Sequence, residues 1–430
     1  MTILAKRRVT EVVLRLSLVF ALLFSSLASA QESRPSHDAL EAPLRGLSRA
    51  DLRHVEPLLD QRIFGLVEQR EGELLPGIHL AARVHAPASE VAALLSEPTR
   101  YPELMPALSA VTMREATGQT RGFSWRWRTS VFTLGGDAMI TVYRPRPGQE
   151  RRGFRIVIER TEGDLGHGRE VWRVLPRGPG ESLLLLSTRM DIRGANPVTR
   201  QLQNAALSRS INLAMSFGML LRVQEAAEDA AGWAAPALGE GIHRPDLDVD
   251  VFEPMLRRGD VLLVEARGAE MRQAAVLTRY NRTEAQVREI MLNPVAFAQA
   301  LIQGSSATIR EQTEEGTCFD WRVDLPIIGT GGAMVLRETE ARLVELEATG
   351  GALEGGRWQF ETTRLPSGAT GVLGWASFDV GTASFLLRAI VDADESFRTG
   401  LSAATQIMFA RALRIRLRHV PPTGIHRHMQ

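Results

Sequence analysis

The chain has 430 residues, of which 44% are hydrophobic and 23% charged, a composition typical of folded globular proteins and enough for two or three domains. The first thirty residues contribute +3 to a formal net charge of +1, which leaves −2 on the rest and excludes a nucleic-acid footprint. Lys6 is the only lysine and Cys318 the only cysteine. Lysine Schiff-base enzymes, P-loop enzymes, intrachain disulfides and multi-cysteine metal sites are therefore excluded for the chain beyond this first segment.

The first thirty residues have the pattern of a secretory signal peptide. Basic residues at 6–8 precede an apolar run over 16–27, and the small residues Ala28-Ser29-Ala30 stand before Gln31. The run is short for a membrane span, although an uncleaved anchor is the alternative. We expect cleavage after Ala30, a periplasmic or secreted location, and a loose leader over residues 31–50.

The predicted elements then follow in a regular order. A short helical segment from Asp51 leads to strands at about 64–69 and 78–85, and Pro87 opens a helix that stops at Pro98. Gly, Pro and Asp clusters separate the strands that come next, and a long helical pattern with one apolar side closes this half. These elements are expected at about 108–117, 122–130, 132–143, 153–161, 168–175 and 182–193 for the strands and 197–231 for the helix.

The same order begins again after a Gly- and Pro-containing segment. Residues 123–139 read FSWRWRTSVFTLGGDAM and residues 319–334 read FDWRVDLPIIGTGGAM, so Phe, Trp, Arg and a Gly pair recur at an offset of 196. Blocks at 55–59 and 252–256 match at an offset of 197. We also match Trp172 with Trp358, and Met190-Asp191-Ile192 with Phe378-Asp379-Val380. Matched blocks in one order indicate an internal duplication, with helices of the second copy at about 283–303 and 383–416.

Each copy combines helices with a run of antiparallel strands, which is typical of the α+β class. Each copy is also long enough to fold as a domain. The sequence therefore predicts tandem domains with a linker between them and a disordered tail. The expected boundaries are 51–231 for the first domain, 232–246 for the linker, 247–420 for the second domain and 421–430 for the tail.

The pattern Pro87-x-x-Glu90-Val91-x-x-Leu94-Leu95, followed by Arg100-Tyr101-Pro102-Glu103-Leu104-Met105-Pro106, resembles the START-like polyketide cyclase and coenzyme-Q-binding superfamily. The resemblance implies a helix-grip fold, in which a curved antiparallel sheet wraps a long C-terminal helix. It also implies a cavity between sheet and helix for lipids, sterols, quinones or polyketides. The second copy departs from the pattern at 281–283 and 294–297, which makes the first domain the stronger candidate for ligand binding.

Aromatic residues gather on one side of the repeated strand. Period-2 alternation places Phe123, Trp125 and Trp127 on one face and Arg126 on the other. Large rings need an apolar cover, so we expect a ligand cavity there, and a solid core packed against the long helix is the alternative. The candidate ligand-binding residues are Trp125, Trp127, Phe132, Met139, Tyr143, Trp172, Met190 and Met215 in the first copy, and Phe319, Trp321, Trp358, Trp375 and Phe378, with Phe360 beside them, in the second.

Other recurring residues have simpler interpretations. Arg126 and Arg322 face away from the aromatic side and favour a surface role. Asp191 and Asp379 are expected to cap a helix or bond a loop. Gly135-Gly136 and Gly331-Gly332 indicate a turn or a bulge where the sheet bends. The histidines lack metal-site spacing, so no catalytic residue, metal or cofactor is predicted.

The leading hypothesis is a carrier that holds a hydrophobic small molecule or lipid between sheet and helix. It expects no nucleic-acid partner, allows a transient membrane contact and indicates no particular protein partner. The second hypothesis is a cyclase-, aromatase- or hydrolase-like enzyme, which needs polar groups in the cavity such as Tyr143, Asp191 or His167. The third is a structural or interaction module that keeps no cavity.

Overall fold

The computed structural model describes most of the chain from Leu44 to Arg418. The predicted signal peptide, most of the leader and the predicted tail lie outside the described residues. The described ranges are 44, 46–69, 77–128, 133–191, 205–268, 270–301, 304–324, 329–340, 343–380, 388, 391–392 and 394–418.

The first repeat contains three short α-helices, eight strands and one long helix within these ranges. Its strands confirm the predicted positions, and the long helix begins within the predicted range, of which 197–204 lie outside the described residues. Its elements are α3 (Arg49–Val55), η1 (Glu56–Leu58), β1 (Ile63–Glu68), β2 (Ile78–Val84), α4 (Ala88–Ser96), η2 (Pro98–Arg100), α5 (Tyr101–Leu104), β3 (Leu108–Thr117), β4 (Thr120–Arg128), β5 (Thr133–Tyr143), η3 (Glu150–Arg152), β6 (Phe154–Gly163), β7 (His167–Gly178), β8 (Glu181–Asp191) and α7 (Ala205–Ala230).

The second repeat runs through the same order after a segment without helix or strand. The predicted helix at 283–303 is wrong as a single element: it is two helices, because Pro294 lacks the N–H that a continuous helix would need. The elements are α8 (Val249–Leu256), β9 (Gly259–Arg267), β10 (Glu270–Tyr280), α9 (Glu284–Met291), α10 (Pro294–Leu301), β11 (Ser305–Thr313), β12 (Gly316–Asp324), β13 (Gly329–Glu340), β14 (Leu343–Gly351), β15 (Arg357–Arg364), β16 (Thr370–Ser377) and α12 (Ser396–Arg418).

The strands of both repeats join in one antiparallel sheet. From the middle outward, the first repeat has the order β1-β2-β8-β7-β6-β5-β4-β3, and the second has β9-β10-β16-β15-β14-β13-β12-β11. Every strand therefore has a counterpart at the same place, which confirms the duplication. The junction is the pairing of β1 with β9, from Ile63 opposite Val264 to Glu68 opposite Gly259. The domain boundaries at 51–231 and 247–420 stay predictions, since the described residues of both repeats belong to one compact unit.

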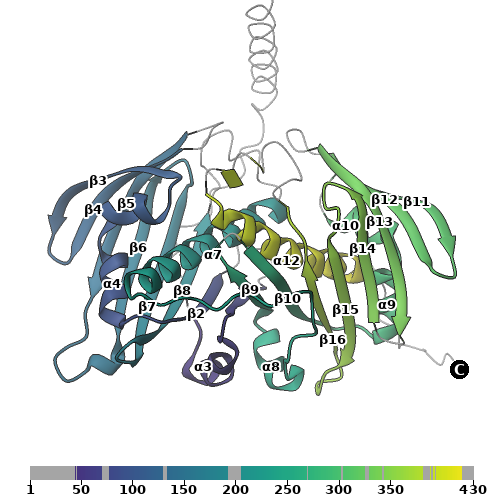
Figure 1. The fold of residues 1–430 in the computed structure, drawn as a ribbon, viewed down its shortest axis with the longest axis horizontal. Helices are drawn as coiled ribbons and strands as arrows, with labels where there is room; N and C mark the ends of the chain where they lie inside the picture. Colours follow the sequence, from purple (N-terminus) through teal and green to yellow (C-terminus); the bar gives the residue numbers. More distant parts are fainter. Residues whose placement is uncertain are drawn as a thin grey trace, which may run out of the picture. The chain divides into compact units, whose positions relative to one another are not determined.

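The two long helices lie side by side in the hollow of the curved sheet (Figure 1). α7 packs on β2 and β8 of its own repeat, and α12 packs on β9, β10 and β16 of its own. Each repeat is thus a helix-grip unit. The crossing is close because a glycine of one helix faces backbone of the other: a Cβ on Gly400 would lie 2.5 Å from the carbonyl oxygen of Ala214.

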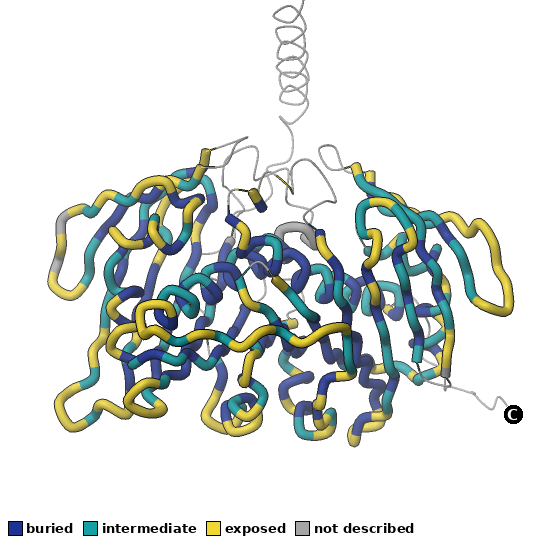
Figure 2. Tube along the Cα trace, in the orientation of Figure 1, coloured by how far each residue is buried: buried dark blue, intermediate teal, exposed yellow. Residues whose placement is uncertain are grey.

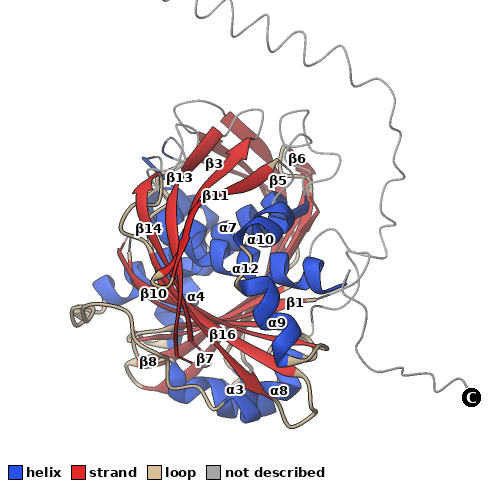
Figure 3. Cartoon of the chain, turned by 90° about the vertical axis from the view of Figure 1, so that its right-hand side faces the viewer, coloured by secondary structure: helices blue, strands red, loops and turns tan. Residues whose placement is uncertain are grey.

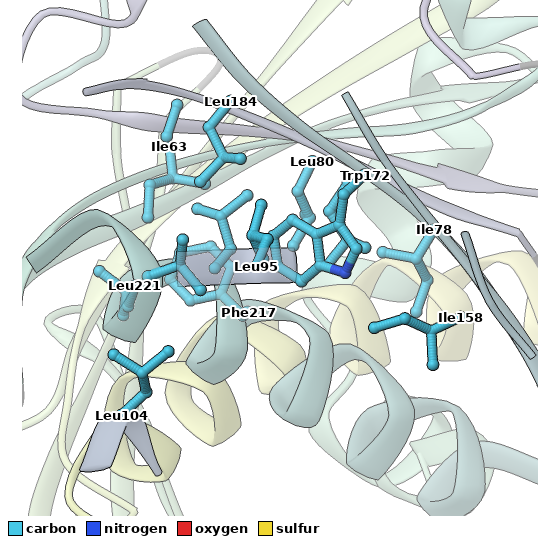
Figure 4. Packing of buried hydrophobic residues seen from close by; sticks show 14 of the residues in the cluster. Ile63, Ile78, Leu80, Leu95, Leu104, Ile158, Trp172, Leu184, Phe217 and Leu221 are labelled. Carbon is cyan, nitrogen blue, oxygen red and sulfur yellow. The ribbon is translucent and has the colours of Figure 1, made fainter. Parts of the chain in front are cut away.

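Alternate side chains of the central strands fill two cores on opposite faces of the sheet. Leu80, Leu184 and Leu186 face the long helices, and Figure 4 shows Trp172 among Ile78 and Leu80 near Phe217 of α7. The other face packs on α3 and α8, which Figure 3 shows on the opposite side of the central strands from α7 and α12. Figure 2 shows burial concentrated on the central strands and long helices, with exposed tips on the outer hairpins.

Candidate functional site

Both repeats place a tryptophan against a glycine of the next strand. Trp125 of β4 lies opposite Gly136 of β5, and Trp321 of β12 lies opposite Gly332 of β13. A Cβ on Gly136 would lie 2.9 Å from the Trp125 ring, and one on Gly332 would lie 3.1 Å from Nε1 of Trp321. The glycine pairs are therefore inside strands, where they let the indole lie on the sheet. In the first repeat the register of β5 against β6 shifts directly after the glycine pair, at 137–138, which agrees with the predicted bulge.

A first cavity of about 100 Å³ lies between this tryptophan-bearing face and α7. Phe123, Trp125 and Trp127 all line it, which confirms that their alternation places them on one face. Tyr101, of the segment that carried the family resemblance, also lines it and donates its hydroxyl to the carbonyl oxygen of Leu95 at 2.6 Å. The lining residues are Tyr101, Met105, Leu108, Phe123, Trp125, Trp127, Ala138, Ile158, Arg160, Leu165, Glu170, Met215, Gly218, Met219, Asp394, Ser396 and Phe397.

The first cavity contains a buried ion pair that the sequence analysis missed. The guanidinium of Arg160 on β6 donates to the carboxylate of Glu170 on β7, and their side chains are only 9% and 4% exposed. Burial raises the pKa of Tyr101, and the nearby Glu170 carboxylate raises it further, so that its phenol stays neutral. Single charged residues in alternating strands carry no sequence signal that they face inward.

A second cavity of about 220 Å³ lies at the corresponding place between α12 and the second half of the sheet. Almost all of its wall is apolar, and Phe319, Trp321 and Phe409 are among the aromatic rings that line it. Its lining residues are Ser210, Val276, Thr278, Tyr280, Met291, Pro294, Phe297, Ala298, Leu301, Phe319, Trp321, Val323, Thr330, Met334, Leu336, Val344, Leu346, Leu353, Phe360, Val372, Gly374, Val380, Leu401, Thr405, Gln406, Met408, Phe409, Ala410 and Leu413.

Strand register shows why the two cavities differ in polarity. Glu159 and Arg169 form an ion pair in the first repeat, and Glu347 and Arg357 form its counterpart, which fixes the offset at 188. With that offset, the second repeat has Ala348 in place of Arg160 and Trp358 in place of Glu170. The sequence match of Trp172 with Trp358 is therefore wrong by two residues. The second repeat replaces a buried ion pair by apolar side chains.

Polar atoms without a hydrogen-bond partner remain on both walls, counted among the described residues. Nε1 of Trp125 is such a donor in the first cavity, and Nε1 of Trp321 is its counterpart in the second. The second cavity adds Oγ1 of Thr278, Oγ1 of Thr330 and Nε2 of Gln406. Buried donors are normally paired, so these atoms indicate where polar groups of a ligand would bind.

Each cavity also receives residues from the other repeat. Asp394, Ser396 and Phe397, at the start of α12, line the first cavity, and the ring of Phe397 lies 5.6 Å from that of Trp127. Ser210 of α7 lines the second cavity. The crossing of α7 and α12 therefore forms part of the wall of both cavities. The prediction of two separate domains did not include such a shared wall.

The structure brings together some predicted residues and separates others. Trp125, Trp127 and Met215 line the first cavity, and Phe319, Trp321 and Phe360 line the second. Trp172, Met190, Trp358 and Phe378 are buried outside the lining. Trp358 stacks on Phe378 at 4.8 Å and supports the wall from behind. Phe132 lies outside the described residues.

Three predicted residues lie on other faces. Met139 follows Ala138, which lines the first cavity, so the alternation of β5 turns Met139 away. Tyr143 is 45% exposed and holds the guanidinium of Arg155 against its ring. Trp375 belongs to the core on the opposite face, where its indole donates to Oε1 of Gln359 at 2.9 Å. Aromatic character alone did not reveal which face each side chain occupies.

The remaining candidates lie on the surface or make structural contacts. Arg126 and Arg322 are exposed, as their alternation predicts. Asp379 pairs with Arg398 of α12 at 3.7 Å, and His167 is exposed. Among the described residues no cluster of His, Cys, Asp and Glu is arranged to hold a metal ion. None of the described helices combines the length and apolar character needed to cross a bilayer.

Comparison with known proteins gives a family match in the first repeat. Residues 78–228 match the family model described as polyketide cyclase / dehydrase and lipid transport. No curated protein matches the chain.

Solved structures that align with the chain include a di-domain protein that spans most of it and shorter chains that span about two fifths of it. The di-domain ARO/CYC StfQ of the steffimycin pathway is 12% identical over 80% of this chain and 99% of its own, with a TM-score of 0.27. The Zhui aromatase/cyclase from Streptomyces sp. R1128 is 18% identical over 37% and 98%, with a TM-score of 0.29. A STAR-related lipid transfer protein from Xanthomonas axonopodis is 16% identical over 39% and 93%, with a TM-score of 0.31.

The family match covers the strands and the long helix that enclose the first cavity, and the second repeat has the same strand order. The first repeat is therefore similar to the polyketide cyclase / dehydrase and lipid transport family, and the chain holds two helix-grip units in tandem.

Proposed function

We propose that the protein is a carrier that holds a hydrophobic ligand in the second cavity and a smaller or more polar one in the first. The observation that carries the proposal is the apolar second cavity of about 220 Å³. A solid core would leave no such space, since protein interiors pack with few voids larger than a water molecule. This supports a ligand-binding protein over a purely structural module.

Apolar burial would supply most of the affinity in this cavity. Each Å² of ligand surface removed from water contributes roughly 25 cal/mol before the costs of association. The unpartnered donors of Trp321 and Gln406 would orient a ligand through an oxygen atom. An elongated lipid-like or polycyclic molecule with one or two oxygens fits these walls.

The test uses residues that the repeats exchange naturally. Val323 occupies the position of Trp127, so Val323→Trp places a ring in the second cavity that the first cavity already tolerates. We expect Val323→Trp to weaken the binding of a fluorescent fatty acid or sterol probe about tenfold or more, because the ring occupies ligand space. Trp127→Val is the matched control and should leave that site unchanged. Native mass spectrometry would identify copurified lipid, and an empty protein that also takes up neither probe would refute the proposal.

A cyclase-like enzyme is the second candidate, and the polar wall of the first cavity favours it. Arg160, Glu170, Tyr101 and Asp394 converge there, although Glu170 is paired with Arg160 and Asp394 accepts from Ser396 at 2.7 Å. Catalysis needs a group that is free to move a proton, and both carboxylates are already paired. The arrangement therefore supports ligand binding over catalysis. If Tyr101→Phe, with wild-type ligand binding, abolished conversion of a linear polyketide analogue, the enzyme hypothesis would replace the carrier.

We also propose a periplasmic or secreted location, supported by the basic, apolar and small-residue pattern of residues 1–30. Between membranes, a carrier would shield its ligand from water. N-terminal sequencing of the protein from its native host should begin at Gln31. A chain that retains its first residues in the cytoplasmic fraction would contradict this location.

A further inference from the structure

A pocket of about 320 Å³ lies on the face of the sheet away from both cavities. We call it the outer pocket. Residues before α3 form one side, and strands β6, β7 and β8 form the floor. It is lined by Leu44, Gly46, Leu47, Leu80, Arg155, Arg169, Val171, Arg173, Leu185 and Ser187.

The outer pocket gathers positive charge that is not neutralised by the described residues. Arg155 and Arg173 lie directly opposite each other in the pairing of β6 with β7, and neither has an acidic partner among the residues that the structure describes. Like charges in directly opposite positions destabilise a sheet. Arg169 is the exception, because its Nε is paired with Oε1 of Glu159 at 3.3 Å.

The electrostatic environment of Arg173 agrees with this arrangement. Burial lowers the pKa of its guanidinium, and the charges of Arg155 and Arg49 lower it further. A guanidinium stays charged in proteins, so the lowered pKa means an unfavourable environment that a bound anion would relieve.

In the second repeat, the positions that correspond to Arg155 and Arg173 carry no unpaired positive charge. At the offset of 188, Leu343 and Glu361 replace Arg155 and Arg173, and they again lie opposite each other. Glu361 accepts a hydrogen bond from Arg244 at 2.6 Å. Trp375 stands where the first repeat has Ser187, and it is buried in the core on this face, where its indole donates to Oε1 of Gln359.

We propose that the outer pocket binds a phosphate group. Guanidinium forks match tetrahedral phosphate oxygens and hold them by charge-assisted hydrogen bonds. Arg155 and Arg173 would share the anion, and Leu44, Leu47, Val171 and Leu185 would pack on the organic part of a phosphate ester. The phosphate could belong to a soluble ester or to a lipid headgroup. The sheet separates this site from both cavities, so phosphate binding can be tested independently of the proposed carrier function.

The experiment compares an outer-pocket variant with a matched arginine variant of the other repeat. Arg155→Leu copies Leu343 and is combined with Arg173→Gln. Arg357→Gln removes the counterpart of Arg169. Binding of inorganic phosphate and glycerol 3-phosphate is measured on the full chain by calorimetry and by the rise in Tm at constant ionic strength. Cosedimentation with phosphatidylcholine vesicles, with and without phosphatidic acid, tests the lipid headgroup.

We expect phosphate binding that falls at least about tenfold in the Arg155→Leu/Arg173→Gln variant and stays unchanged in Arg357→Gln, since only the former loses the paired guanidinium groups. The double variant should unfold at the same or a higher temperature without phosphate, because the repulsion is gone. Binding of the soluble phosphates alone assigns the site to a soluble ester, and binding confined to phosphatidic acid vesicles assigns it to a headgroup. Absence of both, or an equal loss in Arg357→Gln, overturns the proposal.

Discussion

The two repeats have the same strand order, the same long helix and the same tryptophan-on-glycine contact, yet they differ where side chains meet a cavity. The first repeat buries Arg160 and Glu170, whereas the second has Ala348 and Trp358 at those positions. On the other face, Ser187 lines the outer pocket, whereas its counterpart Trp375 is buried in the core. The comparison teaches that duplication preserved backbone geometry while the chemistry of the interior diverged. Each difference can be removed by a substitution that copies the other repeat.

The largest expected effect concerns the buried ion pair. Glu170→Leu leaves Arg160 buried without a counter-charge, which should lower the free energy of unfolding by about 3–5 kcal/mol. Replacing both partners, as Arg160→Met/Glu170→Leu, should restore most of the loss because no charge stays buried. Urea unfolding measures both variants. A single variant as stable as the wild type would mean that water from the cavity already solvates Arg160.

The helix crossing gives the next effect. A Cβ on Gly400 would meet backbone of Ala214, which cannot move away without separating α7 from α12, so Gly400→Ala should cost about 1–3 kcal/mol. Gly218→Ala is the control on the partner helix: its Cβ would come close only to Ser396, with the hydroxyl nearest at 3.0 Å, and we expect a change within about 1 kcal/mol. Thermal unfolding should rank them in this order. Equal costs would show that the crossing is not tightest at Gly400.

A smaller effect tests the repeated tryptophan donors. Trp321→Phe removes the indole N–H from the second cavity and keeps an aromatic ring. The affinity for an oxygen-bearing probe should therefore fall about fivefold, which corresponds to the loss of one hydrogen bond of about 1 kcal/mol. Trp358→Phe is the matched control, because that indole also lacks a partner among the described residues but lies outside the lining. Probe titration gives both values, and equal losses would contradict a direct contact.

The smallest effect concerns the junction between the repeats. Asp51 bonds the N–H of Ser48 at 2.7 Å and accepts from Arg258 of the second repeat, also at 2.7 Å. Burial raises its pKa, but these hydrogen bonds outweigh the burial and hold the pKa below its ordinary value. Asp51→Asn should therefore cost about 1 kcal/mol at neutral pH.

Because the folded-state pKa is depressed, the stability that Asp51 contributes is present above its unfolded pKa and is lost as pH falls through the folded one. The difference between wild type and Asp51→Asn should vanish in strong acid. Unfolding measured across pH 2–7 checks this. A difference that is constant over the whole range would assign the effect to packing instead of charge.

Much of the fold could be read from local patterns. The aromatic strand repeated at an offset of 196 predicted the duplication, and alternation placed Phe123, Trp125 and Trp127 on one face. The position of Trp358 could not be read in this way, because the connection from β5 to β6 (144–153) is longer than the one from β13 to β14 (341–342) and moves the offset from 196 to 188. The burial of Arg160 and Glu170 was not predicted, because a charged residue in a strand usually faces water. Their pairing across adjacent strands offsets the cost of burying both charges.

The sequence by itself determined the α+β class, most of the order of elements, and the two faces of the repeated aromatic strand, because these follow from side-chain periodicity and turn chemistry. Only the tertiary structure decided that β1 pairs with β9, that α12 reaches the first cavity through Phe397, and that the outer pocket is open beside Ser187. These contacts join residues far apart in the chain, and no local pattern encodes them. Their geometry comes from how the two halves of one sheet and the two long helices pack on each other.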